Sequence, residues 1–206
     1  MYFKQLDWGG GEWTNKPIAY SYSETEMYVE PAEGSDYWEK TLYEFQHDTG
    51  HALLTSWPNE TGMEVSFDLN QAFCSLYDQA GLMVWKDAMH WIKIGIEMND
   101  NVPCIAIVAT HIYSDWSLAP VPEWNDSNVT FRISKIKDAI IVRARKDDQD
   151  WHTYRIIYFP FGEDEGVKAG SMANSPTRSG LQVRFTRWML TEPDQGLHEN
   201  PPIQTS

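Results

Sequence analysis

The sequence predicts an all-β fold, either a sandwich or a barrel. Segments in which apolar and polar residues alternate recur along the 206-residue chain, and their spacing of roughly 8 to 12 residues is typical of such folds. No segment keeps an apolar period of about 3.6 residues over three turns, so a long helix is not expected. With 42% hydrophobic residues the chain can also build a sizeable core.

The alternation is clearest in residues 80–98, which read AGLMVWKDAMHWIKIGIEM and predict two strands joined at 86–90. Successive side chains of a strand point to opposite faces. One face of the second strand is therefore pure hydrocarbon. The other carries an indole, an ammonium and a carboxylate, from Trp91, Lys93 and Glu97.

The remaining elements follow from the same pattern and from turn residues. In chain order we expect a hairpin over 41–56 with its turn at 48–50, a strand over 62–70, the strand pair of 80–98, a strand over 104–113, a strand pair over 128–145 joined near 135–138, and strands within 151–161 and 179–190. Residues 68–79 form either a short helix or an irregular edge strand. We expect a single domain over 1–190, followed by a polar tail over 191–206 that lies on the surface or is disordered.

Two sheets packed face to face bury one face each. The residues expected inside share the apolar phase of their strands: Val65, Phe67, Ile92, Ile94, Ile96, Phe131 and Val183. The outer faces are then free, and a curved sheet makes one of them concave.

The composition excludes some partners. A formal net charge of −14 argues against binding to nucleic acid phosphates or to anionic membranes, and it is compatible with a neutral ligand. Ten Trp residues suit flat ligands and sugar rings. We expect no cofactor and no metal.

The cysteines and the N-terminus bear on location. Cys74 and Cys104 each lie beside an apolar run, which favours buried free thiols, with a disulfide as the alternative. The first ten residues have no apolar signal core, and no stretch is long enough to span a bilayer. We therefore expect a cytoplasmic protein with reduced cysteines.

Four blocks in series carry a resemblance. They read DYWEKTLYEFQHDTGHAL, LYDQAGLMVWKDAMHWIKIGIE, SDWS and SPTRSGLQVRFTRW. In this order and spacing the chain resembles, from about residue 36 to about residue 190, a widespread family of functionally unassigned proteins with a concanavalin A-like sandwich. That family includes the fungal protein named for regulation of enolase.

The resemblance implies a jelly-roll sandwich of lectin or glucanase type, and it implies no reaction. The motif YDQAGLM is also similar to sandwich modules attached to β-xylosidases. The chain departs from the family after GLMV, where a basic residue is common and Trp85 stands here.

The main candidate site is the row on the outer face. Across the turn at 86–90, Trp85 and Trp91 should lie close together on the face that carries Lys93 and Glu97. Two exposed indoles beside a cation and a carboxylate would make a platform for a sugar. The alternative is a solvated face with an ion pair. If the row binds a ligand, Trp91→Ala should abolish binding at little cost in stability.

Other candidates flank this row. Tyr77 and Gln79 should lie at the rim, although Asp78 and Gln79 could equally cap a turn. Asp115 and Trp116 should approach from a loop, where Asp115 could instead close an Asx turn.

Tyr43, His51 and Arg184 are further candidate ligand contacts. Tyr43 and Arg184 occupy polar positions, and for Arg184 a salt bridge is slightly favoured. His51 lies across a turn from His47, and a metal site there would need at least one further ligand.

Three hypotheses for function follow. The leading one is a lectin-like module that binds a carbohydrate or related polar ligand on an aromatic-lined concave face. Such a module could also have a regulatory role in carbohydrate metabolism. The second is a glycoside-active enzyme with Glu97 and Asp115 as acid and base, although the paired carboxylates that a retaining glucanase places on one strand are absent. The third is a protein that regulates a glycolytic enzyme by binding it.

Overall fold

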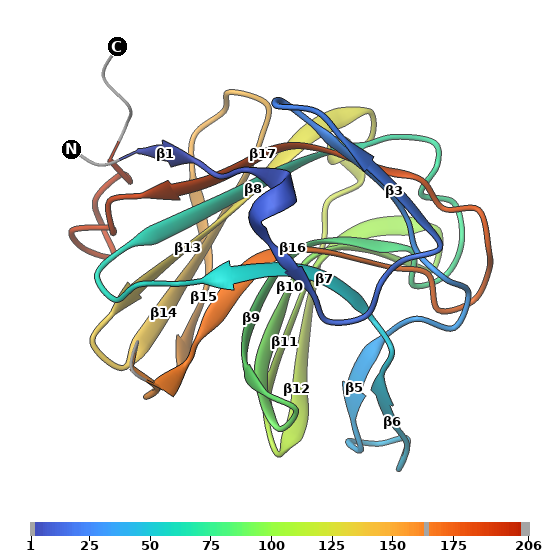
Figure 1. The fold of residues 1–206 in the computed structure, drawn as a ribbon, viewed down its shortest axis with the longest axis horizontal. Helices are drawn as coiled ribbons and strands as arrows, with labels where there is room; N and C mark the ends of the chain where they lie inside the picture. Colours follow the sequence, from blue (N-terminus) through green and yellow to red (C-terminus); the bar gives the residue numbers. More distant parts are fainter. Residues whose placement is uncertain (1–2, 163–164, 203–206) are drawn as a thin grey trace.

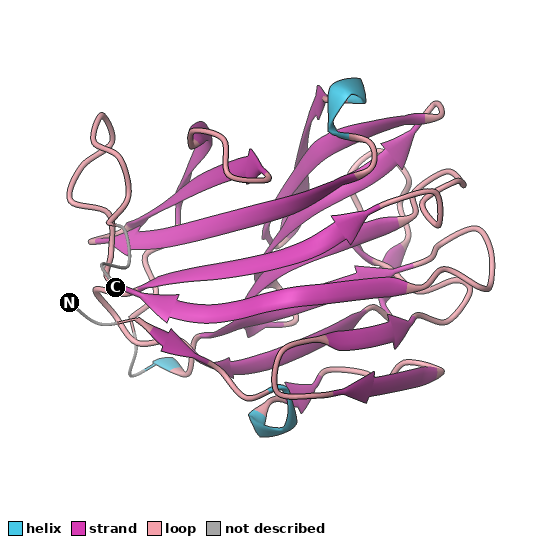
Figure 2. Ribbon diagram, turned by 90° about the horizontal axis from the view of Figure 1, so that it is seen from above, coloured by secondary structure: helices cyan, strands magenta, loops and turns pink. Residues whose placement is uncertain are grey.

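The computed structural model describes residues 3–162 and 165–202, and it is a sandwich of two antiparallel sheets. Strands fill most of the view in Figure 2, and helix is confined to short turns. Those named among the described residues are the 3₁₀ turns η1 (Trp8–Gly10) and η2 (Pro122–Trp124). The fold is the concanavalin A-like jelly roll that the sequence predicts.

We call the two sheets the back sheet and the front sheet. In spatial order the back sheet contains β15 (His152–Tyr158), β14 (Ala139–Lys146), β13 (Ser127–Ile136), β8 (Gly62–Leu69), β17 (Val183–Thr191), β4 (Met27–Glu30) and β3 (Ala19–Tyr22), with β1 (Lys4–Gln5) also paired to β17. The front sheet contains β12 (Tyr113–Pro120), β11 (Val102–His111), β10 (His90–Asn99), β9 (Gln79–Asp87), β16 (Lys168–Asn174), β7 (His51–Ser56) and β2 (Glu12–Trp13).

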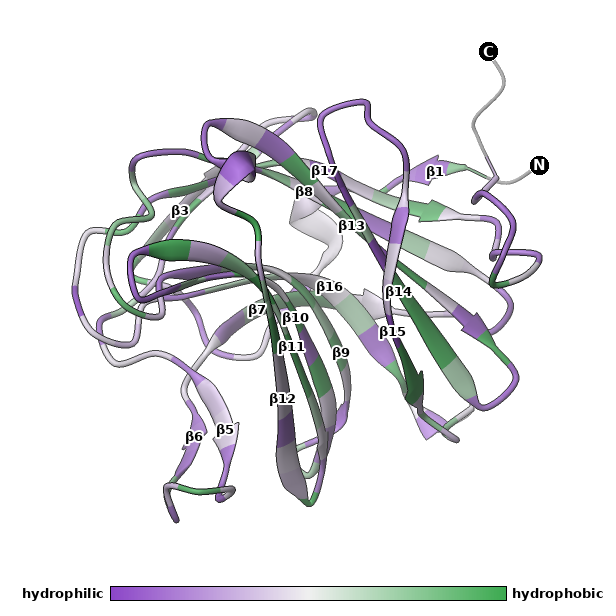
Figure 3. Ribbon diagram, turned by 180° about the vertical axis from the view of Figure 1, so that it is seen from behind, coloured by the Kyte–Doolittle hydropathy of each residue, from purple (hydrophilic) through white to green (hydrophobic). Residues whose placement is uncertain are grey.

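The core lies between the sheets. All seven residues expected inside are buried in it, from Val65 and Phe67 on β8 to Val183 on β17. The two-residue period of each strand places them there, and hydrophobic residues alternate with more polar ones along β13 (Figure 3). The other phase of each strand forms the outer faces.

A third, smaller element covers the front sheet. Strands β5 (Tyr37–Glu39) and β6 (Gln46–Asp48) pair only with each other among the named strands. We call residues 37–48 the β5–β6 hairpin. In Figures 1 and 3 it projects beside the front sheet, on the side away from β14 and β15.

The hairpin expected over 41–56 is wrong. β6 pairs with β5, whereas β7 pairs with β16 and β2. The turn at 48–50 folds back on Asp36, whose carbonyl accepts hydrogen bonds from the backbone amides of Thr49 and Gly50 at 3.1 and 2.9 Å. A Cβ at Gly50 would come within 2.1 Å of the Tyr37 ring, so only glycine lets the chain pass here.

Residues 70–78 form a loop rather than the helix or edge strand that we considered. Phe73 is buried in the core, and its neighbour Cys74 is exposed, which corrects the expectation that both thiols are buried. Cys104 is buried, and both cysteines are free as predicted.

The segment after β17 also differs from expectation. Thr191 still belongs to β17, and Asp194 is only 4% exposed because it pairs with Arg132 and Arg143 on the back sheet. This part of the predicted polar tail is therefore packed against the sandwich.

Candidate ligand-binding site

The strand β10 carries the predicted row on the outer face of the front sheet. Lys93 lies opposite Val108 of β11, and Glu97 lies opposite Cys104. Gly95 separates them, and a Cβ there would come within 2.2 Å of the Ala80 carbonyl oxygen. Glycine is therefore required in the middle of the row, where no side chain separates Lys93 from Glu97.

Trp91 is on this face but is not exposed, which corrects the expectation of two exposed indoles. Its exposed fraction is 1% because Tyr37 of the β5–β6 hairpin lies over it, with ring centroids 5.8 Å apart. The Trp91 indole donates a hydrogen bond to the Ala88 carbonyl at 3.2 Å. Trp85 is half-buried and lies opposite Trp91 in register. Trp91 is therefore a packing residue.

Next to this packed region a cavity of about 290 Å³ opens between the hairpin and the front sheet. Its aromatic walls come from Trp38, Tyr43, Phe45, Tyr77 and Trp116, and its remaining lining from Asp36, Lys93, Glu97 and Val108. A volume near 300 Å³ is at the lower end of the range for small-molecule sites. Five of the residues predicted from the sequence meet here: Tyr43, Tyr77, Lys93, Glu97 and Trp116.

The aromatic walls support one another. Trp38 meets Trp116 edge to face at a centroid distance of 6.2 Å, and Tyr43 stacks on Phe45 at 5.3 Å. The hairpin is fixed to the sheet through Glu39, whose backbone amide donates to the Ser114 hydroxyl of β12 at 2.9 Å. The walls are thus held by contacts with one another and by the hydrogen bond that joins Glu39 to β12.

A cation and two carboxylates form the polar part of the lining. The Lys93 ammonium donates to Asp36 Oδ1 at 2.6 Å, and Asp36 Oδ1 also accepts from the Tyr37 amide at 2.8 Å. Glu97 is 4% exposed, and its Oε1 has no hydrogen-bond partner among the described residues. Burial raises the pKa of Glu97 to about 7. The positive charge of Lys93 lowers this pKa, and the negative charge of Asp36 raises it further.

A second buried group is also without a partner in the described part of the chain. The Trp116 indole nitrogen is buried and makes no hydrogen bond. A buried polar atom without a partner costs about 1–3 kcal/mol. Because the side chains of Glu97 and Trp116 line one cavity, a ligand that supplies both a donor and an acceptor would relieve both.

The loop before β9 holds Tyr77 at the rim. Tyr77 has a left-handed φ of 65°, and its amide donates to the Met98 carbonyl at 2.7 Å. Burial raises the pKa of the Tyr77 hydroxyl. Asp78 is fully buried and accepts from the amides of Cys74 and Ser75 at 3.0 Å each, which is the turn-capping role considered for it.

Two other predicted residues lie close by without lining the cavity. Gln79 is buried behind Asp36, with Nε2 3.4 Å from its Oδ1, and positions that carboxylate. His51 uses both ring nitrogens internally, one with the Asn15 carbonyl and one with the Ala32 amide, each at 3.0 Å. Burial lowers the pKa of His51, so the ring acts as a neutral link between loops.

The prediction that Asp115 approaches the row from a loop is wrong. It belongs to strand β12 rather than to a loop, and it lies opposite Ala109 on the phase that faces the back sheet. Its carboxylate pairs with Arg155 of β15 at 2.7 Å. Glu97 and Asp115 thus lie on opposite faces of the front sheet, and they cannot act together as acid and base.

Arg184 also lies away from the cavity. It sits on β17 of the back sheet and pairs with Glu26 and Asp68 at 2.5 and 2.8 Å, which is the salt-bridge interpretation favoured from the sequence. No group of three or more His, Cys, Asp or Glu suited to a metal ion occurs among the described residues.

The sequence reasoning missed Asp36, Trp38, Phe45 and Val108 as lining residues. Asp36 and Trp38 occur in the block DYWEK, where an acidic residue beside two aromatic ones was a usable signal. Phe45 and Val108 carried none, because their place at the cavity depends on how the hairpin docks on the sheet.

Fold and cavity together define a class: a concanavalin A-like β-sandwich with an aromatic, ligand-sized cavity on the outer face of one sheet. The chain belongs to the family described as "Protein of unknown function (DUF1349)", whose model matches residues 13–193.

Among its relatives, "Regulation of enolase protein 1" of Saccharomyces cerevisiae is 35% identical over 95% of this chain and 97% of its own length. A crystal structure of "a functionally unknown protein" from Saccharomyces cerevisiae matches with a TM-score of 0.80 and 32% identity over 91% of this chain and 99% of that chain.

A more distant structure shares the fold alone. The xylan β-1,4-xylosidase of Bacillus halodurans matches with a TM-score of 0.62 at 12% identity, over 81% of this chain and 33% of that one. No helix within the described ranges is both long enough and apolar enough to span a membrane.

Proposed function

We propose that this protein binds a neutral carbohydrate in the cavity between the β5–β6 hairpin and the front sheet. The observation that carries the proposal is the pair of buried, unpartnered polar atoms, Glu97 Oε1 and Trp116 Nε1, on side chains that line one aromatic cavity. A sugar hydroxyl is both donor and acceptor, so one ring can satisfy the two atoms.

The rest of the lining supports the same ligand class. Aromatic rings cover the apolar C–H face of a sugar, while charged groups fix its hydroxyls. Lys93 is already neutralised by Asp36, which leaves no free cation in the lining for an anionic ligand. A net charge of −14 also disfavours anionic ligands at long range.

A regulatory role through protein binding is the second candidate. It is supported by the printed name of the Saccharomyces relative and by the tip of the β5–β6 hairpin, where Leu42 is 83% exposed beside half-exposed Tyr43 and Phe45. An exposed apolar tip of this kind is typical of contact sites. The tip also walls the cavity, so a bound sugar and a bound partner protein would influence each other.

The test is a glycan array followed by titration calorimetry with the best ligand. We expect Glu97→Ala and Trp116→Phe each to weaken binding about tenfold or more, because each removes one hydrogen bond in a desolvated site. The matched controls Glu26→Ala and Trp151→Phe alter the same residue types far from the cavity and should bind like the wild type. Absence of any glycan ligand, or equal binding by all four variants, would refute the proposal.

A further inference from the structure

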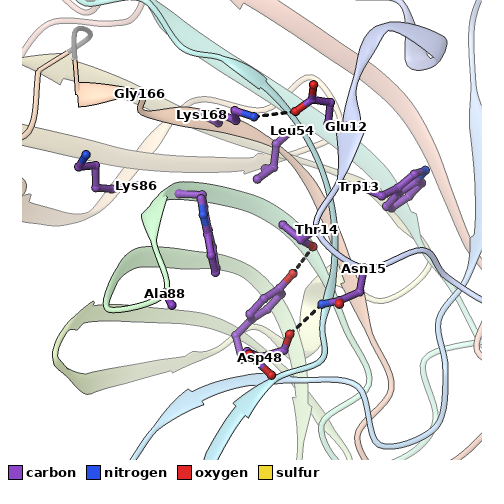
Figure 4. A pocket seen from close by; sticks show the side chains of 12 residues that line it. Glu12, Trp13, Thr14, Asn15, Asp48, Leu54, Lys86, Ala88, Gly166 and Lys168 are labelled. Atoms are coloured by element: carbon purple, nitrogen blue, oxygen red, sulfur yellow. Dashed lines mark hydrogen bonds and ion pairs between the residues drawn. The ribbon is translucent and has the colours of Figure 1, made fainter.

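A second depression lies on the other side of the β5–β6 hairpin (Figure 4). Its volume is about 500 Å³, and it is bordered by β2, β9 and β16 as well as by Tyr37 of the hairpin. We propose that it is a second carbohydrate-binding site, so that the protein holds a polysaccharide at two points. This inference rests on the proposed function for its ligand class.

The aromatic residues that line this depression are Trp13, Tyr37 and Trp85. The ring centroids of Tyr37 and Trp85 are 5.9 Å apart with an interplanar angle of 59°. Trp85 is half-buried, so part of its indole is accessible from the depression. Leu54 and Ala88 add apolar lining beside it. A partly accessible indole is suited to stack on the apolar face of a sugar ring.

The charges around the depression balance. Lys86 and Lys168 contribute two positive charges, and Glu12 and Asp48 contribute two negative ones. Glu12 and Lys168 pair with each other at 2.6 Å, and Figure 4 shows this pair at the rim. Lys86 donates to the Glu165 carbonyl. A lining with no net charge in a chain of net charge −14 favours a neutral, polyhydroxylated ligand over an ion.

The shape of the depression is fixed by the hairpin. The Tyr37 hydroxyl donates to the Gly50 carbonyl at 2.6 Å and lies 2.5 Å from the Thr14 hydroxyl. Asn15 donates to the Asp48 carbonyl at 2.7 Å, as Figure 4 also shows. The site therefore needs no ligand to form.

The two sites lie on opposite sides of the hairpin, because successive side chains of its first strand line different sites. Asp36 and Trp38 line the first cavity, and Tyr37 between them lines the second depression. Two sites held at a fixed spacing bind a repeating polymer more tightly than its short fragments, because the second contact becomes intramolecular. The structure thus favours a polymeric ligand with repeated sugar units.

The experiment compares short and long ligands on the full chain. The probes are xylo-, cello- and laminari-oligosaccharides of three to six units, measured by calorimetry, and the matching polymers xylan, cellulose and laminarin, measured by retention in affinity gels or pull-down. For the oligosaccharide that binds, we expect two sites per wild-type chain. Trp85→Ala and Asp48→Ala should each remove or weaken one site, and Trp116→Phe should weaken the other.

On the matching polymer, Trp85→Ala and Trp116→Phe should each lose affinity about tenfold or more, and the double variant should lose nearly all binding. Trp151→Ala is the control for loss of a remote indole, and a wild-type melting temperature for Asp48→Ala separates a binding defect from misfolding.

The outcomes distinguish the two proposals. If Trp85→Ala and Asp48→Ala bind oligosaccharide and polymer as the wild type does while Trp116→Phe does not, the second site is refuted and the first stands. If only Trp85→Ala and Asp48→Ala lose binding, the first site is refuted and the second stands. If no probe binds, both are refuted.

Discussion

The outer faces of the two sheets both bury charged side chains, but they differ in how many hydrogen-bond partners these side chains have. On the back sheet Arg132 is fully buried, and each of its nitrogens has a partner: Nε bonds Asp194 at 2.8 Å, Nη1 bonds Glu64 at 3.0 Å and Thr191 at 2.7 Å, and Nη2 bonds the Glu192 carbonyl at 2.7 Å. This network ties the segment after β17 to the sheet.

On the front sheet, one carboxylate oxygen of buried Glu97 and the indole nitrogen of Trp116 have no hydrogen-bond partner within the described part of the chain. Burial of an ionised group is costly unless partners compensate it. Around Arg132 the back sheet meets this requirement within the chain, although Nε of Arg145 on the same sheet is buried without a partner among the described residues. The front sheet leaves the requirement open at a cavity. The difference is consistent with a structural role for the Arg132 cluster and supports the proposal of a ligand at the front-sheet cavity.

The largest effect is expected on the back sheet. Arg132→Ala removes one partner from each of two buried carboxylates, Glu64 and Asp194, which keep only Arg187 and Arg143 as charged partners among the described residues. Removal of one member of a buried ion pair costs about 3–5 kcal/mol. Urea denaturation should show a loss of this size, with carbohydrate binding retained under native conditions. A loss below about 1 kcal/mol would show that water or other groups replace the guanidinium, and the contrast between the two faces would fail.

The next effect tests the packed part of the front sheet. Trp91→Ala should cost about 3–4 kcal/mol, because it empties a buried site beneath Tyr37. This expectation reverses the one drawn from the sequence. The matched variant Trp85→Ala removes a half-buried ring and should cost less than half as much. Equal losses in urea denaturation would mean that the hairpin does not distinguish the two indoles.

These two tryptophans show what the sequence could and could not predict. The two-residue alternation around Lys93 and Glu97 is local, so it correctly predicts which side chains point outward. Whether an outward residue is exposed depends on what covers it. Trp91 is covered by Tyr37 of a distant segment, and no local pattern contains that contact.

The same reason explains the misassigned elements. Residues 46–48 have the pattern of a strand, and the sequence correctly indicates that they are extended. Their partner is chosen by non-local hydrogen bonds at Asp36, so the predicted pairing with β7 was wrong. For Asp115, a polar residue was read as a loop residue, whereas its pairing with Arg155 lets it occupy an edge strand.

The third prediction concerns pH and Glu97. Burial raises its pKa from an ordinary value of 4.5 to about 7 in the folded protein. A raised pKa stabilises the fold below pH 4.5, and this stability is lost as the pH rises to about 7. Glu97→Gln removes the dependence, so it should match the wild type near pH 4.5 and exceed it by about 2–3 kcal/mol at pH 8.

Urea denaturation at pH 4.5, 6, 7 and 8 measures this difference. The control Glu12→Gln alters an exposed carboxylate whose pKa is lowered, chiefly by its hydrogen bond with Lys168, and it should show no gain at pH 8. A constant offset between Glu97→Gln and the wild type at every pH would show that Glu97 keeps its charge in the folded state, and that the cavity is better hydrated than its burial indicates.

The smallest effect is expected at Arg184, on the exposed part of the back sheet. Its side chain is 42% exposed and pairs with Glu26 and Asp68. Exposed ion pairs contribute about 0–1 kcal/mol and weaken with salt, so Arg184→Ala should lower the unfolding free energy by no more than about 1 kcal/mol, and by less in 0.5 M salt. Set beside Arg132→Ala, this variant separates the effect of burial from the effect of charge on one sheet. Because Arg184 is remote from the cavity between the hairpin and the front sheet, glycan affinity should be unchanged. A tenfold loss of binding would place a ligand contact on the back sheet, where Tyr28, the cross-strand neighbour of Arg184, lines a depression of about 250 Å³.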